Sequence, residues 1–236
     1  MDERLLIHSF TGAKGFWATD VGPYYLEKSG IDLLRDVVKD HNLKGIKSRK
    51  VSSNLLVMDF GEISASWHLE TNLDQTFLKL RWVESPFETT SGIDLVGLKK
   101  EKWDVSYVEV KTRTSNSGLT SCVSGSSNCL ADQLDSNRCD ARFNSRNMLQ
   151  GSKSAIVRII KEKILKGEFP NDPSIIKKIL RATSYNRYGF VIHPSPIIGT
   201  LFQPAVAQLG SGPIFVDFSF DDMNFELRGF EQDSTI

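Results

Sequence analysis

Two apolar, β-branched runs joined by a short charged stretch constrain the fold more than any other feature of this chain. The first run covers residues 92–98 and the second covers residues 105–111, with a lysine-rich stretch at 99–102 between them. β-Branched and aromatic residues bounded by polar turn residues are typical of β-strands. We therefore predict that the two runs form a β-hairpin.

Further elements are predicted on both sides of this hairpin. Helices are expected over residues 30–39, 61–70, 153–166 and 174–180, and strands over residues 76–83, 188–193 and 214–220. Residues 53–60 fit either a strand or the approach to a helix. The residues at 114–128 are rich in Ser, Gly and Asn and are expected to form a mobile surface loop. The predicted class is α/β or α+β, with a central mixed β-sheet flanked by helices.

The length of the chain sets its domain organisation. With 236 residues it can bury a sizeable core within one domain. We expect a single domain over residues 1–236, in which a core motif region at about 60–135 is followed by a C-terminal region of helices and strands at 150–236.

Composition excludes some classes of protein and leaves others open. No apolar run is long enough to cross a bilayer, and the start of the chain lacks the features of a signal peptide, so a cytoplasmic protein without a membrane partner is expected. Lys plus Arg equals Asp plus Glu at 29 each, which neither indicates nor excludes a local nucleic-acid surface. Cys122, Cys129 and Cys139 match no common zinc spacing, so reduced thiols are predicted.

The predicted hairpin carries the chemistry that the sequence indicates. Glu109 and Lys111 are two residues apart and therefore share one face of their strand, while Asp94 on the preceding strand can approach Glu109. Two adjacent carboxylates require a neutralising cation, and Mg²⁺ prefers such hard oxygen ligands. A metal held there can polarise a phosphate and activate water, and the lysine can stabilise developing negative charge. This set predicts metal-assisted phosphodiester hydrolysis.

The arrangement of residues 92–94, Gly-Ile-Asp, and residues 109–111, Glu-Val-Lys, resembles the PD-(D/E)xK nuclease superfamily. The resemblance implies a restriction-endonuclease-like core, Mg²⁺ or Mn²⁺ as cofactor, and DNA as substrate of an endo- or exodeoxyribonuclease. It implies a catalytic role for Asp94, Glu109 and Lys111, and metal ligation by Asp94, Glu109 and Val110.

The superfamily also implies roles for residues outside the hairpin. It commonly has an acidic residue on a helix before the three-strand meander; Glu62 is our choice for this catalytic position, and Glu84 and Glu88 are alternatives. A helix after the ExK strand often supplies a polar residue, for which Gln133 is the accessory candidate. The basic helix at 153–166 supplies candidate DNA contacts, although an ordinary solvated face fits equally well: Lys153, Arg158 and Lys161.

The size of the chain, the Gly-Glu helix and the isolated ExK core are similar to the nuclease subunit of Hachiman-type anti-phage systems. That family implies a helicase partner and cleavage of invading DNA. A restriction-endonuclease-like enzyme of another defence system, with a different partner or as a homodimer, is an open alternative. So is a catalytically silent module of the same fold that binds nucleic acid or a protein. A third reading is a different hydrolase or an assembly protein, because Glu-x-Lys also occurs by chance.

Overall fold

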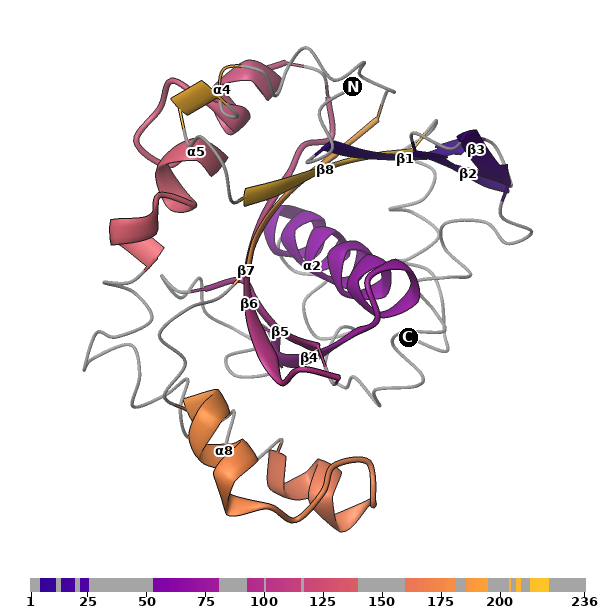
Figure 1. The fold of residues 1–236 in the computed structure, drawn as a ribbon. Helices are drawn as coiled ribbons and strands as arrows, with labels where there is room; N and C mark the ends of the chain where they lie inside the picture. Colours follow the sequence, from indigo (N-terminus) through magenta and orange to yellow (C-terminus); the bar gives the residue numbers. More distant parts are fainter. Residues whose placement is uncertain are drawn as a thin grey trace.

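The structure, a computed structural model, describes residues 5–11, 14–19, 22–25, 53–80, 93–99, 101–115, 117–139, 160–180, 186–194, 204, 207–208 and 213–220. Its centre is an eight-stranded mixed sheet in the order β3-β2-β1-β8-β7-β6-β5-β4, with helices on both faces (Figure 1). The strands are β1 (Leu5–Thr11), β2 (Lys14–Thr19), β3 (Gly22–Tyr25), β4 (Gln75–Leu80), β5 (Leu95–Lys99), β6 (Asp104–Thr112), β7 (Asn186–His193) and β8 (Pro213–Phe220). The α+β class and the mixed sheet are confirmed.

The hairpin predicted from the sequence lies toward one side of this sheet, between the edge strand β4 and the central strand β7. Strands β5 and β6 pair antiparallel, from Leu95 opposite Val108 to Lys99 opposite Asp104. On its other edge β6 pairs parallel with β7, in a register without interruption from Ser106 to Thr112. Because the register is regular, side chains alternate strictly between the two faces of β6.

Helix α2 (Ser53–Asn72) covers one face of the sheet (Figure 1). It settles the open choice over residues 53–60 in favour of a helix and confirms the helix predicted over 61–70. Every residue from 61 to 69 is buried, including Glu62 and Ser66. Because residues 61–69 are covered on all sides, this part of the helix needs no polar face, which explains why its apolar residues follow no single stripe.

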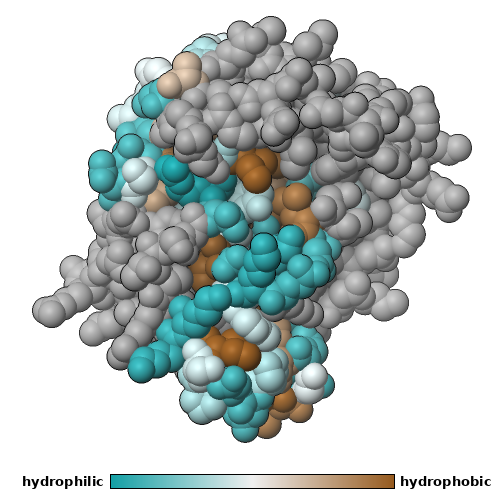
Figure 2. All heavy atoms as spheres, viewed as in Figure 1, coloured by the Kyte–Doolittle hydropathy of each residue, from teal (hydrophilic) through white to brown (hydrophobic). Residues whose placement is uncertain are grey.

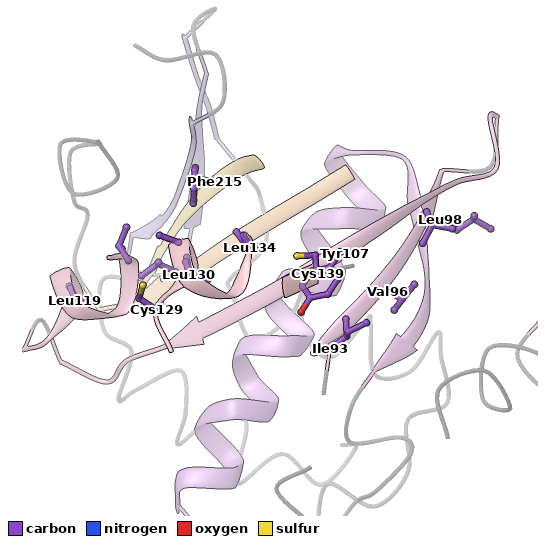
Figure 3. Close-up of a cluster of buried hydrophobic side chains, with 14 of the residues drawn as sticks. Ile93, Val96, Leu98, Tyr107, Leu119, Cys129, Leu130, Leu134, Cys139 and Phe215 are labelled. Atoms are coloured by element: carbon purple, nitrogen blue, oxygen red, sulfur yellow. The ribbon is translucent and has the colours of Figure 1, made fainter. Parts of the chain in front are cut away.

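The opposite face is covered by α4 (Leu119–Val123) and α5 (Leu130–Gln133), followed by helical residues 136–139 (Figure 3). The prediction of a surface loop over residues 114–128 is therefore wrong in part. Leu119 and Val123 are four residues apart, which places both on one side of a helical turn and buries them against the sheet. The flanking residues 117–118 and 125–128 are exposed, as a loop would be.

The three cysteines lie in this helical layer. Cys122, Cys129 and Cys139 are buried and free, and they lie in or directly beside short helical segments. Cys129 caps the start of α5, because its sulfur accepts a hydrogen bond from the Asp132 N–H at 3.4 Å. The cysteines thus contribute to packing and to a helix cap.

The C-terminal helical residues pack beside the turn of the β5–β6 hairpin. This part contains helical residues 160–165 and α8 (Pro173–Leu180). Trp103 in the turn contacts Phe169 edge to face, with ring centroids 5.3 Å apart, and Lys178 donates to the Lys102 carbonyl. Hydrophilic side chains with small apolar patches between them cover this lobe (Figure 2). In the described part of the chain, no helix is long and apolar enough to span a membrane.

Candidate active site

Asp94 lies beside the Glu109–Lys111 segment, as the sequence predicts. It directly precedes β5 and stands one position beyond the last strand pair, Leu95 with Val108. Its Oδ2 accepts a hydrogen bond from the Val110 N–H at 2.8 Å. This bond ties the first carboxylate of the predicted set to the middle residue of the Glu-Val-Lys triplet.

Glu109 and Lys111 form an ion pair on the same strand. The Lys111 Nζ donates to Glu109 Oε1 at 2.7 Å, and the two side chains are 22% and 5% exposed, respectively. A carboxylate that is buried to this extent needs a compensating positive charge, because removing it from water is costly. Lys111 supplies that charge from the more exposed side of the pair.

The two faces of β6 separate these charged residues from the packing of α2. Val105 and Tyr107 belong to the core cluster beneath α4 and α5, so Glu109 and Lys111 project from this same face. Gly189 of β7 is paired with Glu109, and a Cβ atom on it would lie 2.7 Å from Leu134 Cδ1, just after α5. Glu109 therefore belongs to the face that α5 covers.

Glu62 is placed next to the same strand by a close helix–sheet contact. A Cβ atom at Gly61 would overlap the Thr112 Oγ1, so the backbone of α2 lies directly against the C-terminal end of β6. Glu62, the next residue, is 2% exposed. Since Thr112 faces α2, Glu62 approaches β6 from the face opposite to that of Glu109.

Gln133 lies on the helix that covers the Glu109 face. It is buried, and its Nε2 donates to Asn128 Oδ1 at 3.1 Å. Among the residues that the structure describes, its Oε1 has no hydrogen-bond partner. The structure thus brings Gln133 to the expected side of the sheet, where its identified side-chain contact is with the exposed Asn128.

The other members of the predicted set have no identified contact with these residues or lie outside the described residues. Lys161 is exposed on helical residues 160–165. The residues that fall outside the described ranges are Glu84, Glu88, Lys153 and Arg158.

Two carboxylates and one main-chain segment make up the predicted metal site. Across the part of the chain that the structure describes, no group of three or more His, Cys, Asp or Glu side chains is arranged to hold a metal ion. Asp94 and Glu109 provide hard oxygen donors, which suit Mg²⁺ when several waters complete its coordination. The donor set therefore fits a magnesium ion with open positions and does not resemble a closed structural site.

His68 packs in the core and does not border the site. It is fully buried, and its ring meets that of Phe190 edge to face with centroids 5.3 Å apart. Burial lowers the pKa of His68 from 6.5 to about 3, because the protein interior disfavours the charged imidazolium. This histidine is neutral at physiological pH.

We expect His68 to make the protein sensitive to acid. Between about pH 6.5 and pH 3 the unfolded chain binds a proton at this histidine and the folded chain does not, so stability is complete above pH 6.5 and falls as the pH drops. At pH 4.5 the loss is about 3 kcal/mol in the free energy of unfolding. Urea unfolding at pH 7.5 and 4.5 should show a smaller pH-dependent loss for His68→Gln than for the wild type. Equal losses in both proteins would contradict this assignment.

A positively charged side chain that we did not select from the sequence continues the row of Glu109 and Lys111. Arg113 follows β6, and its N–H donates to the Ile192 carbonyl at 2.8 Å, which extends the pairing of β6 with β7 by one step. The sequence contains a pattern that could have identified Arg113, because charged residues occur at 109, 111 and 113, which is the two-residue period of a strand.

Comparisons of the chain with protein-family models, with curated proteins and with solved structures find no match. The function is therefore inferred from the site itself.

Proposed function

We propose that this protein is a metal-dependent DNA nuclease that hydrolyses phosphodiester bonds with Asp94, Glu109 and Lys111. The observation that carries the proposal is the meeting of Asp94 with the Glu-Val-Lys segment through the 2.8 Å bond from the Val110 N–H to Asp94 Oδ2. Without this contact, Glu109 and Lys111 would be an ordinary ion pair on a strand. With it, two carboxylates and one ammonium group lie around the same short stretch of β6.

Asp94 and Glu109 are the residues that would hold the metal ion, with a further oxygen from Val110. In a strand the N–H and C=O of one residue point toward the same neighbouring strand, so the Val110 carbonyl is directed to the side on which its N–H meets Asp94. When bound, Mg²⁺ or Mn²⁺ would polarise a phosphate oxygen and lower the pKa of a coordinated water. Lys111 would then stabilise the negative charge that develops on the phosphate, or orient the attacking water.

The order of elements around the site supports membership of the PD-(D/E)xK superfamily. Helix α2 precedes the meander β4–β5–β6, and α4 and α5 follow the strand that carries Glu109 and Lys111. This order is what the sequence resemblance implies. A Hachiman-type anti-phage setting, in which a helicase is the partner, remains the proposed biological context on the strength of the Gly61–Glu62 helix and the ExK strand.

Glu62 is proposed to support the site from the α2 face of β6. The contact of Gly61 with Thr112 holds α2 against the end of the strand, beside Lys111. A buried carboxylate at this point adds negative charge close to the metal ligands and strengthens the attraction for a cation. Cleavage by Glu62→Ala should be impaired, and a fully active variant would direct attention to Glu84 or Glu88.

The first test is incubation of the purified protein with plasmid and linear DNA, with and without Mg²⁺ or Mn²⁺, beside Lys111→Ala. We expect cutting that requires the metal and is lost in the variant. Cutting of both DNA forms indicates an endonuclease, and loss of linear DNA alone indicates an exonuclease. If the wild type cuts nothing, metal titration of wild type and Asp94→Asn decides between an enzyme that needs its partner and a silent module. Metal binding lost in Asp94→Asn favours the enzyme.

A further inference from the structure

We propose that Arg113 binds a phosphate group of the DNA strand at the mouth of the site. This inference rests on the proposed nuclease function, because it assigns to that site a contact for its anionic substrate. It concerns a residue outside the metal-binding and catalytic set.

The position of Arg113 follows from the geometry of β6. The bond from its N–H to the Ile192 carbonyl keeps the backbone in the parallel ladder with β7, one residue beyond Thr112, the last residue of β6. Two-residue alternation then places Arg113 on the face of Glu109 and Lys111, one step further toward solvent. Burial changes in the same direction, from buried Glu109 through partly buried Lys111 to exposed Arg113.

Arg113 is exposed, which leaves its guanidinium group accessible within the described part of the chain. The two other arginines whose side chains the structure describes have partners: Arg138 pairs with Asp132, and Arg187 donates to the Leu134 carbonyl. For Arg113, in contrast, the side chain forms no ion pair or hydrogen bond within the described residues. Its planar, permanently charged group can bind two oxygens of one phosphate.

The segment after Arg113 suits a polyanion. No Asp or Glu occurs from residue 113 to residue 131. Many side chains in this segment are exposed hydroxyl or amide groups, which bind phosphate oxygens in protein–DNA complexes. They are Thr114, Ser115, Ser117, Thr120, Ser121, Ser126, Ser127 and Asn128. The segment itself therefore presents no carboxylate that would repel a DNA strand lying along it.

The formal charge of the site gives Arg113 a defined role. Asp94 and Glu109 together carry two negative charges, which Lys111 alone offsets only by half. Arg113 brings the formal sum of these four side chains to zero, and a bound divalent ion raises it to plus two. The buried Glu62 on the opposite face of β6 lowers each sum by one. Attraction of phosphate before the metal binds therefore depends on Arg113 more than on any residue of the proposed metal site.

The test measures DNA binding without metal, so that it does not depend on cleavage. Fluorescence anisotropy with labelled single- and double-stranded DNA is recorded in EDTA at several salt concentrations for wild type, Arg113→Gln, Arg113→Lys and Lys177→Gln. Lys177 is a matched control because it is exposed on α8, which lies beside the hairpin turn. From that turn β6 runs about 30 Å to Arg113. We expect Arg113→Gln to bind about ten-fold more weakly and to lower the salt slope by about one, because one phosphate contact is lost.

Each outcome decides the proposal. Arg113→Lys should recover part of the affinity, and Lys177→Gln should bind as the wild type does. Equal weakening in Arg113→Gln and Lys177→Gln would show a general charge effect and overturn the inference, as would a wild type that binds neither form of DNA. If Arg113→Gln alone weakens binding but no metal-dependent cleavage occurs, the phosphate contact stands and the nuclease proposal fails. If cleavage occurs and binding and KM are unchanged in Arg113→Gln, only the inference about Arg113 fails.

Discussion

Replacing Glu109 by alanine is expected to lower the rate of metal-dependent DNA cleavage by about a thousand-fold or more. A metal ion supplies several kcal/mol of transition-state stabilisation, and about 4 kcal/mol corresponds to three powers of ten in rate. Glu109 is one of two carboxylates in the proposed site and the more deeply buried of them, so Asp94 alone should not retain the ion. Single-turnover cleavage and metal titration should both be lost.

Stability measurements separate this chemical role from a role in folding. Glu109→Ala leaves Lys111 without its partner, but the lysine is partly exposed and can turn to water, so we expect a loss of about 1 kcal/mol in the free energy of unfolding. Lys111→Met instead removes the ammonium partner of a buried carboxylate and should cost about 3 kcal/mol. The double variant Glu109→Gln with Lys111→Met should recover much of that stability and none of the activity. Unfolding of Glu109→Ala at room temperature would show that its inactivity has a structural cause.

Alanine at Gly61 is expected to destabilise the protein and to impair cleavage, although it replaces a glycine inside a helix. In an exposed helix this change normally stabilises by about 1 kcal/mol, since alanine has the higher helix propensity. Here the new Cβ atom would overlap Thr112 Oγ1, and either α2 or the end of β6 must move. We expect a loss of about 3 kcal/mol, as for an overpacked core. Urea unfolding and the cleavage rate measure the two effects.

The matched control for this prediction removes the Thr112 hydroxyl group, which is the atom that the new Cβ would overlap. Thr112→Ala deletes the hydroxyl that the alanine Cβ would meet, so Gly61→Ala with Thr112→Ala should be more stable than Gly61→Ala alone. Recovery of cleavage in the double variant would indicate that the spacing of α2 and β6 positions the site. A Gly61→Ala protein as stable as the wild type would refute the close contact.

Several parts of the fold were predictable because they depend on short-range patterns. The apolar runs around Asp94 and Glu109 indicated the hairpin, and the two-residue period placed Glu109 and Lys111 on one face. Strands β4, β7 and β8 and helix α8 also agree with their predicted ranges within a few residues. In each case the signal lies in neighbouring residues, and it does not depend on which other segment the element meets.

The N-terminal strands and the helical turn at Leu119–Val123 were missed for the opposite reason. Strands β1, β2 and β3 contain few clear alternations, and β1 takes its place in the sheet by pairing with β8, about two hundred residues further along the chain. Leu119 and Val123 stand in a segment rich in turn-forming residues, and only burial against the sheet makes a helical turn favourable there.

The candidate site likewise has one part that local sequence patterns predict and another part that depends on tertiary contacts. The sequence alone identified Asp94, Glu109 and Lys111, because strand alternation and the chemistry of paired carboxylates are local properties. Only the tertiary structure decided that α2 lies against Thr112 and that Arg113 ends the row of charged residues in the open. Both depend on which strands and helices pack together, and such contacts between distant segments are set by burial of the whole core, which no short stretch of sequence encodes.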